Sequence, residues 1–303
     1  MSRLEKALEK ATKMREEKKE VEAEKSVSKT KVLDTFKTEE SLKLNSPYLV
    51  TLTEPDSPIS EEYRKLKSLI VKLTKADKFH NALMVTSSVK GEGKSITALN
   101  LAITLAQEYD HTVLFVDADL RQPSMNRYYD IKPEIGLTEC LVNGAKIGDA
   151  LIKTGIGRLV ILPSGNKVSN PAELLSSSMM RELVKELKNR YVDRYVIIDT
   201  PPILPFAEAQ SIGSVVDGVI FVVKEGQVSL NNIKEALSLL KDTNIFGFVY
   251  NGAELDRFDG YHYYHYYKSY YSHKSNDVDK ANGLTTGWMR SLEGHSTVNK
   301  KSE

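Results

Sequence analysis

The sequence predicts a doubly wound α/β domain with a mostly parallel sheet over residues 48–255. Short apolar runs rich in β-branched residues alternate there with stretches of helical pattern. The runs are apolar throughout instead of alternating with polar residues, which is typical of strands buried on both faces of a parallel sheet. Regular alternation of strand and helix over roughly 200 residues indicates a single domain of this class.

Six strands and three of the intervening helices follow from these patterns. The expected strands are, in chain order, Ala82–Thr86, Thr112–Val116, Leu159–Leu162, Tyr195–Ile198, Gly218–Val223 and Phe246–Tyr250. The expected helices include Lys94–Glu108, Pro171–Arg190 and Leu230–Leu240. The helix at Pro171 has a well-formed start, because Asn170 is a capping residue type and proline suits the first helical position.

Residues 1–47 precede this domain as a charged helical segment and linker. Apolar residues recur there at spacings of three or four from Leu4 to Met14, among many Lys and Glu residues. This pattern indicates a helix with a thin apolar stripe, either solvated on all sides or used as a docking helix for a partner protein. Residues 26–46 are polar and irregular, so a linker is expected there.

Two segments follow the domain. Residues 256–271 form a tyrosine cluster, since the stretch from Tyr261 to Tyr271 holds seven of the chain's 15 tyrosines. Residues 272–303 are mostly polar, with Trp288 as their largest apolar residue, and a disordered tail is expected there.

Composition excludes several classes of protein. Lys and Arg number 42 against 41 Asp and Glu, a net charge of +1, so no global basic field favours nucleic acid as a partner. The single cysteine, Cys140, cannot form an internal disulfide or a cysteine metal cluster alone, which indicates a reducing compartment. No apolar run approaches the ~18 residues of a membrane helix, and no signal peptide is evident. We therefore expect a cytoplasmic protein.

A phosphate-binding motif follows the first expected strand. The general P-loop is GxxxxGK[ST] between a strand and a helix, and here Ser88 stands in place of its first glycine while the end of the motif is intact. The glycines let backbone amides turn toward phosphate oxygens at the helix N-terminus. In this pattern the lysine reaches the β- and γ-phosphates and the serine binds Mg²⁺. The expected nucleotide-binding residues are Gly91, Glu92, Gly93, Lys94, Ser95 and Ile96, with Asn251 as a candidate for adenine.

Carboxylates follow two more of the expected strands. Asp117 and Asp119 end the second strand, and Asp199 ends the fourth. Carboxyl ends of parallel strands line the crevice in which ligands bind, so Asp199 is expected to be a Mg²⁺ residue of the Walker B type. For Asp117 or Asp119 taken alone, a helix cap or a turn is the alternative interpretation.

With these motifs in place, the sequence resembles the deviant-Walker P-loop ATPases, and among them the bacterial protein-tyrosine kinases (BY-kinases) of polysaccharide export loci. The resemblance spans roughly residues 55–271, and the stretch from Met1 to Ala11 is similar to cytoplasmic autokinases of exosortase-linked exopolysaccharide loci. It implies ATP and Mg²⁺ as cofactors, with Ser95, Asp119 and Asp199 at the metal. It also implies that Asp117 is the base for the acceptor phenol, and Arg121 is suited to stabilise charge on the transferred phosphoryl group.

The resemblance further implies an assembly and several partners. The family has a Glu-x-x-Arg-x-x-Arg helix that packs subunits into rings; Glu61 and Arg64 match it, but Lys67 lacks the bidentate fork of arginine. An exposed charged helix is the alternative interpretation. The implied partners are a membrane-bound polysaccharide co-polymerase, or chain-length regulator, as activator and a phosphotyrosine phosphatase. The activator would recruit the kinase to the inner face of the membrane.

Three interpretations of the tyrosine cluster compete: an aromatic edge strand, an adhesive surface patch and an autophosphorylation tail. The kinase-like motifs upstream favour the third, and His262 and His265 lack a third metal ligand at suitable spacing. The expected phosphoacceptors are Tyr261, Tyr263, Tyr264, Tyr266, Tyr267, Tyr270 and Tyr271.

Two other functions remain open at this point. A MinD/ParA-type positioning ATPase has a signature lysine five residues before the P-loop lysine, which falls at Val89, whereas Lys90 is one place off. A nucleotide-gated adaptor would keep the P-loop but form no phosphotyrosine.

Overall fold

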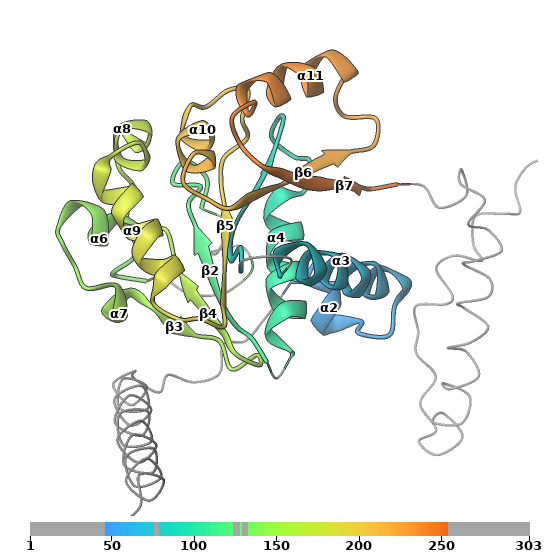
Figure 1. Ribbon diagram of the computed structural model, residues 1–303, viewed down its shortest axis with the longest axis horizontal. Helices are drawn as coiled ribbons and strands as arrows, with labels where there is room; N and C mark the ends of the chain where they lie inside the picture. Colours follow the sequence, from blue (N-terminus) through green and yellow to red (C-terminus); the bar gives the residue numbers. More distant parts are fainter. Residues whose placement is uncertain (1–45, 76–78, 109, 124–127, 129–132, 254–303) are drawn as a thin grey trace, which may run out of the picture.

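The computed structural model describes residues 46–75, 79–108, 110–123, 128 and 133–253. The expected N-terminal helix, the tyrosine cluster and the C-terminal tail lie outside these residues. Within them the chain folds around one seven-stranded sheet with helices on both faces (Figure 1). The expectation of a doubly wound α/β domain is therefore confirmed.

The sheet has the strand order β3-β4-β2-β5-β1-β6-β7. All its pairs are parallel except β3 with β4, so the sheet is mostly parallel, as expected. The sequence patterns missed β3, which has two residues and therefore shows no recognisable apolar run. The strands are β1 (Ala82–Ser87), β2 (Thr112–Asp117), β3 (Ile152–Lys153), β4 (Leu159–Leu162), β5 (Arg194–Asp199), β6 (Gly218–Lys224) and β7 (Ile245–Asn251).

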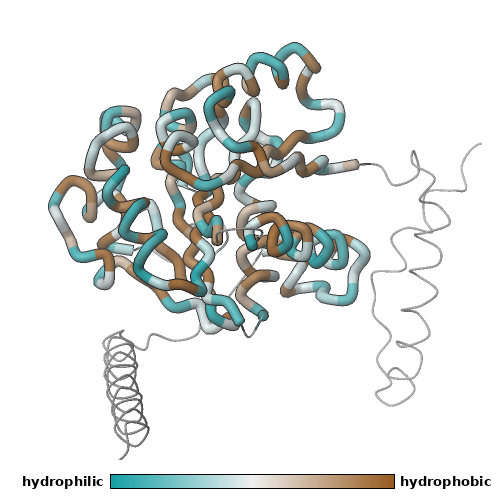
Figure 2. Tube along the Cα trace, viewed as in Figure 1, coloured by the Kyte–Doolittle hydropathy of each residue, from teal (hydrophilic) through white to brown (hydrophobic). Residues whose placement is uncertain are grey.

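Successive residues of the central strands are buried against helices on opposite faces of the sheet. Leu83 and Val85 of β1 belong to one apolar cluster, and Met84 between them belongs to the other. Figure 2 shows the resulting apolar strands between more polar outer helices. On the first face lie α2 (Val50–Thr53), α3 (Pro58–Thr74) and α4 (Lys94–Ala106). On the second lie α6 (Leu137–Val142), α7 (Ile147–Ala150), α8 (Pro171–Leu175), α9 (Ser178–Asn189), α10 (Glu208–Gly213) and α11 (Leu230–Leu239).

One expected helix is wrong in its extent. The stretch 171–190 is two helices, α8 and α9, separated at Ser176 and Ser177. The Ser177 hydroxyl accepts a hydrogen bond from the Met180 N–H, so this serine caps a new helix. Asn170, by contrast, makes no side-chain cap at the start of α8, although Pro171 does occupy the first turn. The apolar periodicity continues across the serines, which is why it suggested a single helix.

Asn100, a residue of α4, holds the stretch 48–51 with the start of α2 against that helix. Its side chain is fully buried; its Nδ2 donates to the carbonyls of Tyr48 (3.0 Å) and Ile96 (2.9 Å). Its Oδ1 accepts from the N–H (3.1 Å) and the hydroxyl (2.9 Å) of Thr51. One amide of the P-loop helix thus satisfies polar groups of the stretch 48–51 and of its own helix.

We expect Asn100→Ala to lower the free energy of unfolding by about 2–4 kcal/mol, because it leaves several buried polar groups without a partner. Urea unfolding followed by circular dichroism would measure this. Asn189→Ala is the matched control, since that exposed amide bonds only within its own helix and its loss should cost less than about 0.5 kcal/mol. Equal effects of the two substitutions would contradict the role of Asn100.

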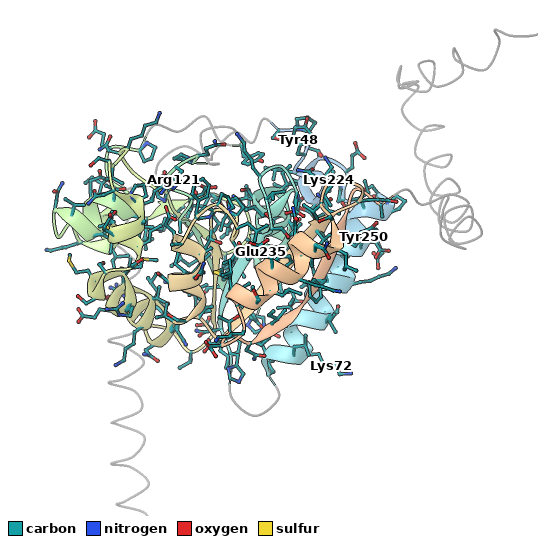
Figure 3. The ribbon with its side chains drawn as sticks, turned by 90° about the horizontal axis from the view of Figure 1, so that it is seen from above. Tyr48, Lys72, Arg121, Lys224, Glu235 and Tyr250 are labelled. Atoms are coloured by element: carbon teal, nitrogen blue, oxygen red, sulfur yellow. The ribbon has the colours of Figure 1, made fainter. Side chains whose placement is uncertain are left out.

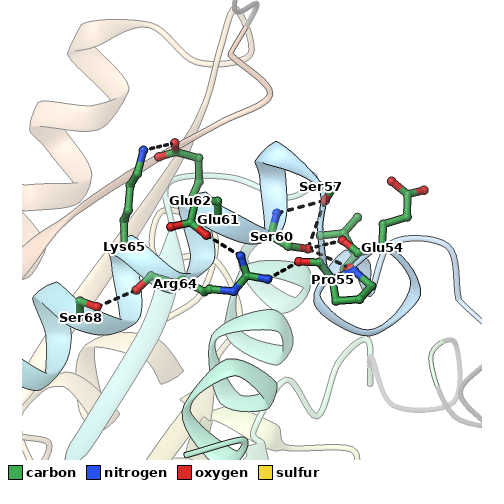
Figure 4. Close-up of polar contacts among 10 residues, drawn as sticks. Glu54, Pro55, Ser57, Ser60, Glu61, Glu62, Arg64, Lys65 and Ser68 are labelled. Atoms are coloured by element: carbon green, nitrogen blue, oxygen red, sulfur yellow. Dashed lines mark hydrogen bonds and ion pairs between the residues drawn. The ribbon is translucent and has the colours of Figure 1, made fainter. Parts of the chain in front are cut away.

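Helix α3 carries the Glu61, Arg64 and Lys67 positions of the expected ring helix. Glu61 pairs with Arg64, which also donates to the carbonyl of Pro55 (Figure 4). The Lys67 Nζ lies 2.6 Å from the Glu108 carboxylate just beyond α4. These charges therefore make contacts within the subunit, and their use in a ring stays a prediction.

The only cysteine lies in α6. Burial, together with the nearby Glu139 and Asp149 carboxylates, raises the pKa of the Cys140 thiol to about 11. At pH 7.5 the thiolate fraction of Cys140 is therefore at least about 100-fold smaller than that of a free cysteine. We therefore expect iodoacetamide to alkylate native protein at least about 100-fold more slowly than urea-unfolded protein, measured by mass spectrometry over time. Equal rates would contradict the buried, uncharged thiol.

Candidate active site

The P-loop connects β1 to α4 at the carboxyl edge of the sheet. Gly91 and Gly93 both have left-handed backbone conformations, with φ of 92° and 93°. A Cβ built at Gly93 would lie 2.1 Å from the Asn251 Nδ2, so glycine is required there for two reasons. Ser95 and Ile96 follow in the first turn of α4, both half-buried. The sequence prediction of a strand–loop–helix context is confirmed.

Side chains from neighbouring strand ends hold this loop in shape. Asn251, at the end of β7, donates from Nδ2 to the carbonyl of Glu92 (2.8 Å). Gln227, in the loop after β6, donates from Nε2 to the carbonyl of Lys90 (2.7 Å). The buried Glu92 carboxylate accepts from the backbone N–H of Val89 (2.7 Å). The Glu92 side chain therefore stabilises the loop. The expected contact of Glu92 with nucleotide is then one made by its backbone, and it stays a prediction.

Lys94 lies among the carboxylates of two adjacent strands. Its Nζ is 2.8 Å from the Asp119 Oδ2 and 3.6 Å from the Asp199 Oδ1, and it donates to the Ser95 hydroxyl at 3.1 Å. Asp117 and Asp199 are partners in the register of β2 and β5, and both are fully buried. The structure thus brings together the lysine, the serine and all three aspartates that the sequence singled out.

These contacts change the acidity of the site. Burial alone would lower the pKa of Lys94, but the charges of Asp199, Asp119 and Asp117 outweigh it and raise that pKa above its usual value. Burial raises the pKa of Asp199, against the opposing effects of Lys94 and a hydrogen bond with Ser95. Lys94 is therefore a fixed cation at neutral pH, and its charge opposes the effect of burial on the pKa of Asp199.

The oxygen atoms here suit Mg²⁺ together with phosphates. Mg²⁺ is usually held by one or two carboxylates, water and substrate phosphates instead of an all-protein cage. In the described residues no three His, Cys, Asp or Glu side chains converge on one point, whereas Ser95, Asp199 and Asp119 surround Lys94. Such a partial set of ligands fits a cation that arrives with a nucleotide.

Arg121 lies further along the same edge, beyond Asp119. Its Nε donates to the Glu208 carboxylate at 2.7 Å, and its guanidinium lies 4.4 Å from the centre of the Phe206 ring. In the view of Figure 3, Arg121 and Lys224 lie toward the upper side of the molecule, left and right of its centre, and Lys72 lies at its lower side. The structure records no direct contact between Arg121 and Lys94, so the role of Arg121 in charge stabilisation stays a prediction.

Sequence reasoning missed Gln227 and Glu208. Gln227 lies just after the carboxyl end of β6, and the rule that ligand sites gather at such ends was a usable signal. Glu208 comes nine residues after Asp199, at the start of the short helix α10. No motif or periodicity marks it, because its partner is 87 residues away in the chain.

A parallel sheet with a P-loop and three aspartates at its carboxyl edge defines a P-loop nucleotide-binding domain of the nucleoside-triphosphatase class. A family model described as an AAA domain matches residues 82–245. The chain is 38% identical over 218 residues to tyrosine-protein kinase YwqD of Bacillus subtilis, covering 71% of this chain and 90% of that protein. This chain therefore belongs to the bacterial protein-tyrosine kinase family.

Further relatives agree with this assignment. The putative tyrosine-protein kinase CapB of Staphylococcus aureus is 31% identical over 212 residues, which is 69% of this chain and 91% of that protein. The solved kinase domain of the Escherichia coli tyrosine kinase ETK superposes with a TM-score of 0.63 at 30% identity, covering 71% of this chain and 83% of that structure. The resemblance inferred from the motifs is confirmed, and the chain is a protein-tyrosine kinase.

Proposed function

We propose that this kinase uses Mg·ATP to phosphorylate the tyrosines of its own C-terminal cluster, Tyr261–Tyr271. The observation that carries the proposal is the position of Asn251, the last residue of β7, whose side chain donates to the P-loop carbonyl of Glu92. The chain therefore leaves the sheet beside its own nucleotide site. Nine residues, 252–260, separate this point from Tyr261, and they span at most ~30 Å. That length reaches the chain's own site or that of a neighbouring subunit.

In this reaction the phenol oxygen of the acceptor bonds to the γ-phosphorus while the bond from that phosphorus to the β–γ bridging oxygen breaks, releasing ADP. Asp117 takes the phenol proton, because tyrosine has a pKa near ~10 and is protonated at neutral pH. Lys94 binds the β- and γ-phosphates and offsets their charge. Bound Mg²⁺, held through Ser95, Asp119 and Asp199, would supply further charge neutralisation at the phosphates. Arg121 would stabilise the charge of the transferred phosphoryl group.

The biological role that we propose is the regulation of exopolysaccharide or capsule synthesis and export. Within the part of the chain that the structure describes, no helix has the length and apolar character to cross a bilayer. A membrane-bound polysaccharide co-polymerase would therefore serve as the activator and bring the cytoplasmic kinase to the inner face of the membrane. A phosphotyrosine phosphatase would reverse the modification.

We further propose that the kinase forms a homo-oligomeric ring through α3, and that the unmodified cluster docks on a neighbouring subunit. Each phosphate adds about −1.5 to −2 charges, so a modified cluster is repelled by the aspartates and by bound nucleotide. Phosphorylated and dephosphorylated samples should then differ in oligomer mass by light scattering. Identical masses would refute this docking cycle without affecting the autokinase proposal.

The decisive experiment incubates the purified full chain with Mg·ATP and maps phosphotyrosine by mass spectrometry, with Lys94→Ala as the control. The expected result is phosphate on residues between Tyr261 and Tyr271 that is absent from the control. Phosphotyrosine on an added peptide but none on the cluster would refute autophosphorylation of the tail. If the protein binds nucleotide but forms no phosphotyrosine even with its activator present, it acts as an adaptor; hydrolysis alone would indicate a positioning ATPase.

A further inference from the structure

Arg121 is held on two sides by residues that no sequence motif indicated. The Glu208 carboxylate, fully buried, accepts from the Arg121 Nε at 2.7 Å. The Phe206 ring lies 4.4 Å from the guanidinium carbon, within the range of a cation–π contact. The Arg121 side chain is nevertheless 37% exposed. This arginine is therefore anchored at its inner nitrogen and on one face while part of it remains at the surface.

The contact joins the two loops that carry the site aspartates. Arg121 follows Asp119 after β2, and Glu208 begins α10 after the loop that starts at Asp199. The second carboxylate oxygen of Glu208, Oε2, is buried and accepts no hydrogen bond from any described residue. Burying a carboxylate is costly unless it is paired, so Arg121 is the group that makes the buried position of Glu208 tolerable.

The terminal nitrogens of Arg121 are the part of its guanidinium that the hydrogen bond to Glu208 does not use. No described residue accepts a hydrogen bond from its Nη1 or Nη2, and its hydrogen bond to Glu208 uses Nε. A guanidinium presents its N–H groups as a planar fork that matches the oxygens of a phosphate. With Nε and one face fixed, the direction in which this fork points is fixed as well.

We propose that Glu208 is a positioning residue for the kinase reaction: it orients Arg121 so that the arginine's terminal nitrogens bind the phosphoryl group that is passing to the acceptor tyrosine. Phe206 supports the same orientation through the face of the guanidinium. This inference rests on the phosphoryl-transfer role proposed above for Arg121. The ligand of the Arg121 terminal nitrogens is then a tyrosine phosphate monoester, or the phosphoryl group that becomes part of one.

The test compares Glu208→Gln, Arg121→Ala and the double variant in the full chain of 303 residues. Phosphotyrosine formation is followed at saturating Mg·ATP, both on the chain itself and on a random Glu–Tyr copolymer as added acceptor. Nucleotide affinity is measured separately with a fluorescent ADP analogue. We expect Glu208→Gln to lower the rate constant by roughly 10- to 100-fold, as a displaced catalytic group would, while nucleotide affinity changes less than about twofold.

The double variant separates positioning from structural support. If Glu208 acts through Arg121, Glu208→Gln should have no further effect in an Arg121→Ala background. A further loss of the same size there, or an equal loss of nucleotide affinity, would overturn the proposal. Asp217→Asn is the matched control, because it removes a carboxylate that pairs with Lys188 (2.6 Å) and supports β1, and it should leave the rate constant unchanged.

Phe206→Leu provides a second route if Glu208→Gln fails to fold. It removes the aromatic face but keeps the carboxylate, and we expect a smaller loss, of about threefold to tenfold, that again disappears in the Arg121→Ala background. A wild-type protein that phosphorylates the copolymer but not its own tail would refute the autophosphorylation proposal alone. Wild-type activity on both acceptors with no effect of either variant would refute the positioning of Arg121 alone.

Discussion

Lys94→Met is expected to abolish tyrosine phosphorylation, with a loss of roughly 10²–10³-fold or more. The ammonium group is the fixed positive charge of the site, and removing such a group where transition-state charge develops has effects of this size. Methionine keeps most of the apolar stem, so the loss reports on the charge instead of on packing. Phosphotyrosine formation at saturating Mg·ATP, followed by mass spectrometry, is the measurement.

The same substitution should destabilise the fold, because it leaves Asp199 buried without its cation. Breaking a buried pair in this way costs about 3–5 kcal/mol. The pKa of Asp199 is already raised in the wild type and must rise further once Lys94 is removed. A carboxyl group whose pKa is higher in the folded than in the unfolded state stabilises the fold fully at pH values below its unfolded pKa, which is near 3.8 for Asp199. This contribution is lost as pH rises through the folded-state pKa.

The variant should therefore lose more stability than the wild type as pH rises from the unfolded pKa of Asp199, near 3.8, to neutrality. In the wild type Lys94 stays charged throughout that window, because its own pKa is raised above the usual 10.5. Urea unfolding of both proteins across this range measures the difference. Parallel stability curves for the two proteins would contradict the coupling between Lys94 and Asp199.

Gly93→Ala is expected to weaken nucleotide binding by about 100-fold or more, corresponding to roughly 2.7 kcal/mol. Alanine is strained at a φ of 93°, and its Cβ would lie 2.1 Å from the Asn251 Nδ2. Relief of this contact requires Asn251 to leave the Glu92 carbonyl, which changes the shape of the loop that binds phosphate. Titration with a fluorescent ADP analogue provides the measurement.

Gly144→Ala is the matched control for this prediction. Gly144 also has a positive φ, 66°, but nothing lies within 4 Å of the added Cβ. It should cost about 1 kcal/mol of stability from backbone strain and leave nucleotide affinity unchanged. The combination of Gly93→Ala with Asn251→Ala should recover part of the lost affinity. A normal affinity in Gly93→Ala itself would show that the loop tolerates a side chain.

The sequence predicted most of the sheet and the central part of the site, for a physical reason. Continuous apolar runs report burial on both faces, and the residues that follow such runs meet at one edge. Asp117, Asp119 and Asp199 are predicted in this way and Lys94 by the P-loop motif, and the structure brings them together. The extent of the helix at Pro171 was not predictable from periodicity, because the serine cap at Ser177 interrupts the helix without interrupting the pattern.

The contacts that support the site were beyond the reach of sequence patterns. Glu92 carries the charge expected of a solvent-exposed loop residue, yet it is fully buried and bonded to the backbone. Asn251 was identified as a candidate for adenine, and the structure places it on the P-loop backbone, so its contact with adenine stays a prediction. Both contacts depend on how separate segments approach each other, which no local pattern records.

The single hydrogen bond from Asn251 to the P-loop also makes two equilibria interdependent. The residue ends the strand from which the C-terminal segment departs, and it braces the loop that receives phosphate. If a nucleotide shifts this contact, it changes the free energy with which the tail engages another surface. Thermodynamic reciprocity then requires that engagement of the tail change nucleotide affinity by the same factor. In that case one coupling free energy would govern both the exchange of ADP for ATP and the release of the tail.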